Sequence, residues 1–380
     1  MKSIMQKDLW SITSFLENKN YKFNKENILT QLPEKFIDEA IEAISSWDNY
    51  APTPLIKLNK LNDELKFKNI YYKDEDKRFD LKSFKALGGA FAVYKIASEK
   101  KNITVSTATA GNHGRSVAWG AQRLGLKCKI FISEFVSESR AEAMRKLDAE
   151  VIRVKGNYDN SLKECIKQSK ENNWEIVQDV SWEGYKEVPK LIMAGYTIMI
   201  KEILDEVKSN SISHVFLQAG VGGMAAAMIA GFAKLSQNIP KFIIVEPENA
   251  DCVFQSIKNN KPTSVDIKKE TVMGGMSCGD VSSIAWEILK NSSNYCLTIS
   301  DEAISTTVAL LAEKRLSDLK IIAGECAVPG IIALISSFNN KEYLDKLELN
   351  EQSNVLLFGC EGLTDSAMYQ KLLSDGLQKI

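Results

Sequence analysis

The sequence is poor in the residues that metal centres, disulfide frameworks and hydrolase triads require. Histidine occurs only twice, as His113 and His214, and the seven cysteines include no Cys-x-x-Cys pair. These counts exclude a histidine-rich metal site and speak against a zinc site or a secreted disulfide framework. The Gly-x-Ser-x-Gly spacing of the α/β-hydrolase nucleophile elbow occurs at 275–279, and a Ser-His-Asp hydrolase would have to use one of the two histidines. We therefore expect no bound metal.

The sequence also lacks an excess of either charge and any long apolar segment. Its formal net charge is −1 over 380 residues, which provides no general attraction to nucleic acid or to an anionic membrane. No apolar run approaches the roughly 20 residues of a membrane-spanning helix, and residues 1–8 lack the apolar core of a signal peptide. The hydrophobic fraction of 44% supports a large core in one or two domains. These features predict a soluble cytoplasmic enzyme with no nucleic-acid or membrane partner.

Three glycine-containing stretches carry the chemical signal, and the first surrounds Lys85. This lysine stands where a charged, strand-like segment (71–78) meets an apolar, helix-permissive one (86–97), and Gly88 and Gly89 follow it closely. Burial lowers the pKa of a lysine amine, which suits Schiff-base chemistry. The alternative is a solvated surface lysine, the usual state of this residue type.

The second stretch is Gln-Ala-Gly-Val-Gly-Gly-Met at 218–224. It follows an apolar run (214–217) and precedes a predicted helix of small residues (225–233). A glycine turn between a strand and a helix N-terminus presents backbone N–H groups that can bind a phosphate. The loop has neither the Lys-Ser/Thr of a Walker motif nor the third glycine of a dinucleotide fingerprint, and the alternative is a packing turn.

The third stretch is Thr-Ala-Thr-Ala-Gly-Asn-His-Gly at 107–114, before a predicted helix at 116–124. Its small and polar residues suit binding of a carboxylate at a helix N-terminus. Strand-like and helical runs alternate along the chain, which predicts an α/β protein with parallel sheets flanked by helices. Ligands of such sheets bind at the carboxyl ends of strands, where both loops are expected. Near the N-terminus, apolar spacing predicts helices at 12–18 and 36–47.

Together the three stretches resemble those of the fold-type II pyridoxal phosphate enzymes. Ser-Phe-Lys-Ala-Leu-Gly-Gly (83–89), the asparagine loop (107–114) and the glycine loop (218–224) occur in the family's order. Thr-Pro-Leu at 53–55 and Cys-Glu-Gly at 360–362 extend the resemblance over nearly the whole chain.

The resemblance implies a two-lobed, tryptophan synthase β-like α/β fold with parallel sheets flanked by helices. The large cofactor-binding domain would comprise residues 1–85 and 190–380, and the small domain residues 86–189. The implied cofactor is pyridoxal 5′-phosphate, the implied partner is a small amino-acid substrate, and the family's habit is a homodimer.

The resemblance also implies roles for single residues. Lys85 would hold the cofactor covalently and later move the substrate's α-proton, and Asn112 would hydrogen-bond the cofactor's phenolic oxygen. Cys360 would lie beside the pyridine nitrogen, where a thiol favours elimination over transamination; the alternative is a small buried hydrophobe. Asp179 would be a catalytic carboxylate that pairs with a substrate ammonium; the alternative is an aspartate that only forms a turn at the end of a strand.

The resemblance also implies binding residues. The phosphate would bind the backbone of Gly220, Val221, Gly222, Gly223 and Met224. The implied substrate contacts are Thr107, Ala110, Gly111, Asn112, His113 and Asp179.

Further segments resemble the diaminopropionate ammonia-lyases rather than the serine and threonine dehydratases. They lie at 177–185, 188–189, 245–252, 277–280, 286–289, 324–325 and 327–328. This resemblance implies elimination of the β-amine of L-2,3-diaminopropionate to give pyruvate and ammonia. The alternatives are a serine, threonine or 3-hydroxyaspartate dehydratase, or a non-catalytic homologue that binds pyridoxal phosphate or an amino acid.

One position departs from the family's pattern. The family carries an acid in the asparagine loop, Thr-Asp-Gly-Asn-His-Gly, as the base that serves the D-isomer on the face opposite the lysine. Here that position is Ala110, whose methyl group cannot accept a proton. We therefore expect either an enzyme restricted to L-substrates or one that acts on another β-substituted amino acid.

Two cysteines fall in the family-like segments, Cys252 and Cys278. In a reducing cytoplasm we expect two thiols, and a disulfide between them is the alternative.

Overall fold

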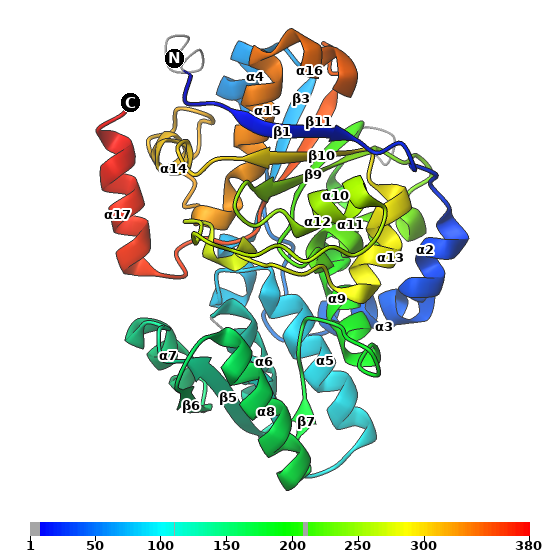
Figure 1. Ribbon diagram of the computed structural model, residues 1–380, viewed down its shortest axis with the longest axis vertical. Coiled ribbons are helices and arrows are strands. Elements are labelled where there is room, and N and C mark those ends of the chain that lie inside the picture. Colours follow the sequence, from blue (N-terminus) through cyan, green and yellow to red (C-terminus); the bar gives the residue numbers. More distant parts are fainter. Residues whose placement is uncertain (1–7, 110, 208–211) are drawn as a thin grey trace. The chain divides into compact units, whose positions relative to one another are not determined.

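A computed structural model describes residues 8–109, 111–207 and 212–380. The chain forms two compact units, whose helices and strands are labelled in Figure 1. Unit 1 comprises Met1–Gln31, Pro52–Lys77 and Met199–Ile380, and unit 2 comprises Leu32–Ala51 and Arg78–Ile198. Each unit contains its own sheet.

Unit 1 is built on a seven-stranded sheet. Its strands are β1 (Ile12–Glu17), β2 (Leu55–Lys57), β3 (Asn69–Asp74), β8 (His214–Gln218), β9 (Lys241–Pro247), β10 (Tyr295–Ile299) and β11 (Asn354–Gly359). Their order is β1-β10-β9-β8-β11-β3-β2, with antiparallel pairing only at the edge strands β1 and β2 among the described residues. Every residue of β8, β10 and β11 is buried, as expected for parallel strands covered on both faces.

Helices pack around this sheet. They are α2 (Lys25–Gln31), α4 (Asn59–Leu65), α10 (Ile198–Glu206), α11 (Gly223–Leu235), α12 (Cys252–Asn259), α13 (Ser283–Ser292), α14 (Ile304–Ala312), α15 (Pro329–Asn339), α16 (Lys341–Leu347) and α17 (Ser366–Leu377), with short 3₁₀ turns η1 (Glu75–Asp80), η2 (Gly274–Met276) and η3 (Glu325–Ala327). Both α11 and α15 contact the sheet and are buried along most of their length. Small residues let α11 pack closely, and a Cβ on Gly231 would lie 2.9 Å from the Ile200 side chain.

Unit 2 has a four-stranded parallel sheet of order β6-β5-β4-β7. The strands are β4 (Thr104–Ala108), β5 (Lys127–Ser133), β6 (Glu150–Val154) and β7 (Glu175–Ile176). The helices are α3 (Glu34–Ser45), α5 (Lys85–Glu99), α6 (Asn112–Arg123), α7 (Glu138–Arg145), α8 (Tyr158–Asn172) and α9 (Glu187–Tyr196). Helix α5 packs against both α6 and α9, so its first residue, Lys85, is held by a closely packed helix.

The predicted α/β architecture with parallel sheets is confirmed, and so is the helix predicted at 36–47, which is α3. The helix predicted at 12–18 is wrong, because this segment is strand β1. It pairs antiparallel with β10, from Ile12 opposite Ile299 to Glu17 opposite Tyr295. Hydrogen bonding to the edge of the sheet therefore outweighs the local helical pattern.

The expected domains, 1–85 with 190–380 and 86–189, have different boundaries from the two compact units. Helix α3 contacts α5 and α9, which brings residues 32–51 into unit 2. Lys85 belongs to unit 2 as well. The expected ranges remain a prediction about cofactor-binding domains, whereas the units describe how the chain packs.

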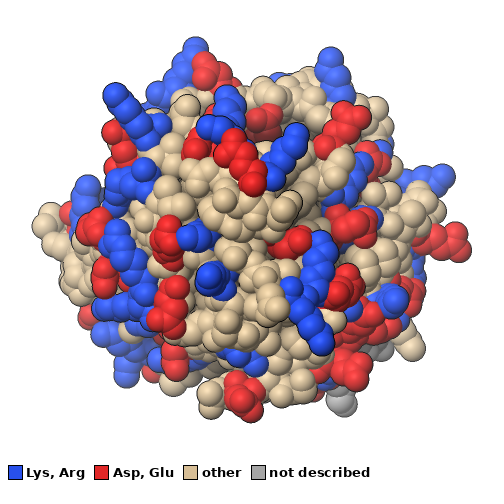
Figure 2. All heavy atoms as spheres, turned by 90° about the horizontal axis from the view of Figure 1, so that it is seen from below, with Lys and Arg blue, Asp and Glu red and all other residues tan. Residues whose placement is uncertain are grey.

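Surface charge, helix character and the state of the cysteines can be compared with what the composition predicted. Figure 2 shows basic and acidic side chains interleaved over the face that it draws. Among the described helices, none combines the length and the apolar character needed to cross a membrane.

All seven cysteines are thiols, so the prediction of two thiols at Cys252 and Cys278 is confirmed and the alternative disulfide is wrong.

Candidate active site

In unit 2, Lys85 forms an ion pair with a carboxylate that lies 94 residues away in the sequence. Its Nζ is 2.5 Å from Oδ2 of Asp179. The rings of Phe84 and Tyr196 have their centroids 5.5 Å and 5.8 Å from the same Nζ. The side chains of Lys85 and Asp179 are 26% and 14% exposed, so the amine is partly buried and not a solvated surface group.

The Asp179 carboxylate stays ionised in this setting. Burial raises the pKa of Asp179, but its charged surroundings and the hydrogen bond from Lys85 lower that pKa more, to well below the usual range of an aspartate. An ionised carboxylate beside a primary amine can bind an ammonium or stabilise the protonated lysine.

The asparagine loop begins α6 and is held by Thr109. The Thr109 Oγ1 accepts hydrogen bonds from the backbone N–H of Gly111 (3.0 Å) and of Gly114 (3.2 Å). Asn112, the first residue of the helix, is half-buried. Ala110, predicted as a substrate contact, lies outside the described residues.

Thr107 and His113, two other predicted substrate contacts, are both buried. The Thr107 hydroxyl donates to Gln178 Oε1 at 2.9 Å, so it supports the end of β4. The His113 ring lies with Nε2 2.8 Å from the carbonyl oxygen of Val177 and Nδ1 3.8 Å from Oδ2 of Asp179. His113 therefore belongs to the same cluster as Lys85 and Asp179.

Gln178 is a structural residue of this site that sequence reasoning did not single out. Its Oε1 accepts from the N–H of Ala108 (3.0 Å), and its Nε2 donates to the carbonyl of Ala108 (2.9 Å) and to the hydroxyl of Tyr158 (2.7 Å). These bonds fasten the segment that carries Asp179 to the carboxyl end of β4. The only sequence signal is its place next to Asp179.

In unit 1, the glycine loop connects the carboxyl end of β8 to the N-terminus of α11. Gly222 has φ +87°, a conformation that side chains rarely adopt. A Cβ on Gly220 would lie 2.9 Å from Sγ of Cys278, whereas a Cβ position on Gly223 has no atom within 4 Å. The loop is thus packed on one side and open at the helix N-terminus, so its backbone N–H groups fit the phosphate of a cofactor.

Cys360 follows β11, which pairs directly with β8, so Cys360 and the glycine loop follow adjacent parallel strands of unit 1. The buried Cys360 thiol donates to the carbonyl oxygen of Cys326 at 3.1 Å. The same oxygen accepts from Nε2 of Gln218 at 2.9 Å. Gln218 therefore helps to fix the turn that holds the Cys360 side chain.

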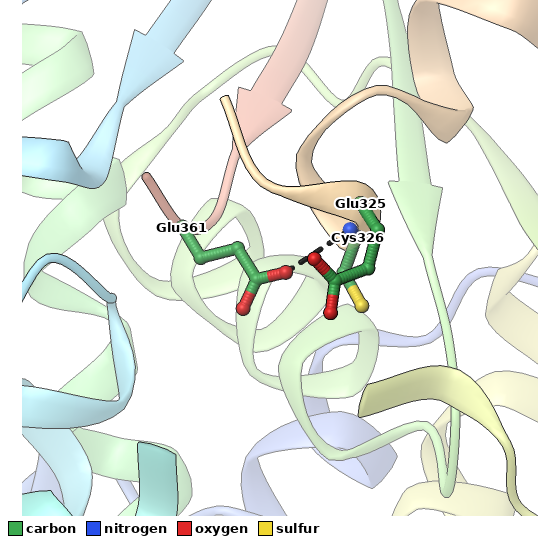
Figure 3. A group of neighbouring side chains, drawn as sticks. All are labelled: Glu325, Cys326 and Glu361. Atoms are coloured by element: carbon green, nitrogen blue, oxygen red, sulfur yellow. Dashed lines mark hydrogen bonds between the residues drawn. The ribbon is translucent and has the colours of Figure 1, made fainter. Parts of the chain in front are cut away.

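Figure 3 draws a second group of side chains in unit 1. Glu325, Cys326 and Glu361 are buried, and their potential ligand atoms all lie within 4.8 Å of one another. The backbone N–H of Cys326 donates to Oε1 of Glu361 at 3.0 Å, which accounts for the position of that carboxylate. Burial and the two glutamates raise the pKa of Cys326 well above its usual value, so its thiol is protonated. That no metal is required remains a prediction.

Comparison with known proteins places this geometry in a family. The family model for pyridoxal-phosphate dependent enzymes matches residues 47–358. Diaminopropionate ammonia-lyase of Escherichia coli (strain K12) is 34% identical over 352 residues, which cover 86% of this chain and 88% of that protein. The crystal structure of the Escherichia coli diaminopropionate ammonia lyase in complex with D-serine matches with a TM-score of 0.89 and 30% identity, over 97% of this chain and 98% of that chain. An L-threonine dehydratase of Haemophilus influenzae is 30% identical over 213 residues, 56% of this chain and 39% of that protein.

The matched range includes Lys85, Asn112 and the glycine loop in the order that the motifs predicted. It spans most of both compact units, and the sheets of both have the parallel core expected of the fold. The chain therefore belongs to the family of pyridoxal-phosphate dependent enzymes, with fold-type II architecture and pyridoxal 5′-phosphate as its cofactor.

Proposed function

We propose that this protein is an ammonia-lyase that eliminates the β-amine of L-2,3-diaminopropionate, with pyruvate and ammonia as products. The observation that carries the proposal is the contact between Lys85 Nζ and Asp179 Oδ2 at 2.5 Å, in a chain similar to diaminopropionate ammonia-lyase over 86% of its length. This contact brings together a lysine that is suited to covalent catalysis and a carboxylate that is suited to binding a substrate ammonium.

Several residues are suited to hold the cofactor. The bound pyridoxal phosphate would supply the electron sink that makes the substrate's α-proton removable. Lys85 would be its covalent attachment point, and Asn112 would donate to its phenolic oxygen. Gly220, Val221, Gly222, Gly223 and Met224 would bind its phosphate through backbone N–H groups, and Cys360 would lie beside its ring nitrogen. The open N-terminus of α11 and the buried Cys360 thiol support this assignment.

Lys85 would then act as the base for the proton on Cα, with Asp179 as its charged partner. The Lys85 amine removes the proton from Cα, and the resulting ammonium is stabilised by Asp179. The β-ammonium already carries three protons, so it leaves as ammonia when its bond to the β-carbon breaks, and the proton taken from Cα stays on Lys85. Because the Asp179 pKa is strongly lowered, the carboxylate remains charged throughout and does not compete for the proton.

Binding of the amino acid would involve the asparagine loop. The N–H groups at the start of α6 suit the substrate's α-carboxylate, with Gly111, Asn112 and His113 nearest to the helix start. Thr107 supports the loop through Gln178. Asp179 would pair with the ammonium on the β-carbon, which favours diaminopropionate over the hydroxyl-bearing serine, threonine and 3-hydroxyaspartate.

A panel of L-2,3-diaminopropionate, L-serine, L-threonine and 3-hydroxyaspartate, scored by keto-acid release and ammonia, tests the substrate. We expect kcat/KM to be highest for diaminopropionate. A higher kcat/KM for a hydroxy amino acid would identify a dehydratase instead. Tight cofactor binding without turnover of any of these substrates would support the non-catalytic alternative.

We also propose that the protein is a cytoplasmic homodimer. The seven cysteine thiols suit a reducing compartment, and the dimer follows the habit of the family. Light scattering on the purified holoenzyme would measure a mass twice that of the 42.4 kDa chain. A mass of one chain would contradict the proposed dimer.

A further inference from the structure

In this structure the Lys85 ammonium lies among polar groups of unit 2 that could bind another ammonium. Asp179 Oδ2 is 2.5 Å from Nζ, and His113 Nδ1 is 3.8 Å from the same carboxylate oxygen. The Tyr196 ring centroid is 5.8 Å from Nζ. A primary ammonium has three N–H donors, so it can serve more than one of these acceptors at once.

The imidazole of His113 is fixed in one tautomer. Its Nε2 is 2.8 Å from the carbonyl oxygen of Val177, which can only accept, so Nε2 carries the hydrogen. In the neutral ring Nδ1 then carries a lone pair. Burial lowers the pKa of His113 below its ordinary value, despite the opposing effect of the nearby Asp179 carboxylate, and this favours the neutral ring.

Among the described residues, no hydrogen-bond donor reaches this lone pair. His113 is 5% exposed, and its Nδ1 has no hydrogen-bond partner within the described chain. Leaving a buried acceptor unsatisfied is unfavourable, and native proteins seldom do so. An unsatisfied acceptor beside an ionised carboxylate, in the cluster that contains Lys85, indicates a place where a donor binds.

We propose that His113 Nδ1 and Asp179 Oδ2 together form the subsite for the substrate's β-ammonium, and that His113 selects an ammonium over a hydroxyl. This inference rests on the proposed function. When Lys85 is engaged with the cofactor, its Nζ leaves Asp179, and the β-ammonium takes the place that the Lys85 ammonium occupies here. An ammonium donates to both acceptors, whereas a hydroxyl has one proton and leaves one of them unsatisfied.

The two histidines allow a direct test of the subsite by ¹⁵N-histidine NMR on holoenzyme reduced with borohydride, which holds Lys85 on the cofactor. We expect an unprotonated Nδ1 in His113 and a shift of its resonance on titration with ammonium chloride. Tetramethylammonium chloride, which has the same charge and no N–H donor, should leave it in place. His214 is the internal control, because its Nδ1 lies 2.8 Å from the Ser213 hydroxyl and its Nε2 lies 2.9 Å from the Leu347 carbonyl. A protonated Nδ1 in His113, or no response to ammonium, would overturn the proposal.

The selectivity is tested with matched variants at position 113. In His113→Gln the amide nitrogen can still donate to Val177, but the acceptor at Nδ1 is lost. We expect the ratio of kcat/KM for diaminopropionate to that for serine to fall by about 10–100-fold, the size of a hydrogen bond to a charged group. In His113→Asn the amide oxygen can replace Nδ1 as acceptor, so this ratio should fall much less.

The outcomes separate this inference from the proposed function. Equal losses on both substrates in His113→Gln would assign His113 a positioning role only and would overturn the selectivity. A wild-type enzyme active on serine but not on diaminopropionate would contradict the proposed function, while the ammonium titration would still decide whether the subsite exists. Cofactor absorbance and melting temperature report whether each variant is folded, and the titration of the wild-type enzyme needs no variant.

Discussion

Gly88 and Gly195 lie so close together that a Cβ on Gly195 would stand 2.8 Å from the Cα of Gly88. Gly88 is in the first turn of α5 and Gly195 is near the end of α9. A Cβ on Gly88 would in turn lie 2.4 Å from the Tyr196 ring and 2.5 Å from the carbonyl oxygen of Ile192. The absence of side chains at both positions lets the helix that begins with Lys85 rest directly on α9.

Gly195→Ala should therefore destabilise the protein and misplace Lys85. Overpacking of this kind costs about 1–3 kcal/mol in unfolding free energy. Chemical denaturation measures that loss, and turnover should fall as well because α5 must shift. Gly274→Ala is the matched control, because its Cβ position has no atom within 4 Å. Equal stability of the two variants would contradict the close approach.

Lys85→Ala should abolish turnover, because the covalent attachment point and the base for the α-proton are removed together. Loss of a positioned base alone typically lowers the rate by about 10²–10⁴-fold. The visible absorbance that borohydride bleaches should disappear as well. Lys85→Arg is the control for charge, because its cation can still pair with Asp179 but is not expected to attach to the cofactor. Turnover near the wild-type rate in either variant would refute the site assignment.

Asp179→Asn should weaken diaminopropionate binding and change how stability depends on pH. The pKa of Asp179 is lower in the folded protein than in the unfolded chain, so its ionised form stabilises the fold. This contribution is fully present above the unfolded aspartate pKa of about 3.9 and is lost as the pH falls through the lower folded value.

The measurement is urea denaturation of wild type and Asp179→Asn at pH 7 and at pH 3. The wild type should be the more stable protein at pH 7, and the difference should shrink at pH 3. In parallel, kcat/KM for diaminopropionate should fall by about 10–100-fold in the variant, as expected on loss of a charged hydrogen bond. A stability difference that is the same at both pH values would show that Asp179 is not ionised against a cationic partner.

The wild-type enzyme should strongly prefer L- over D-diaminopropionate. Inverting Cα moves its proton to the face opposite Lys85, which the family's acid is expected to serve, and the sequence has Ala110 at the position of that acid. Without a positioned base on that face, the rate on the D-isomer should be about 10²–10⁴-fold lower. Ala110→Asp should recover part of the D-activity, and Ala110→Asn, which is similar in size but not basic, should not. Similar rates on both enantiomers in the wild type would mean that another group acts as the base.

The local signals in this sequence were sufficient for the fold class, and they led to the candidate site residues. Strands followed by glycine turns and helix starts predicted the asparagine loop and the glycine loop, because turn, capping and strand patterns depend on residues close together in the chain. The same local reasoning failed at β1, whose conformation is decided by pairing with β10, from Ile12 opposite Ile299 to Glu17 opposite Tyr295.

The sequence by itself determined the α/β class and the order of the motifs, and it singled out Lys85 as the candidate catalytic lysine. Only the tertiary structure decided that Lys85 pairs with Asp179 and that Gln178 fastens the segment carrying Asp179 to β4. It also decided that Nε2 of His113 bonds to the Val177 carbonyl, which leaves Nδ1 without a hydrogen. Each of these contacts joins residues 64 or more positions apart. Distances across such separations depend on how helices and strands pack, and no local pattern in the chain encodes them.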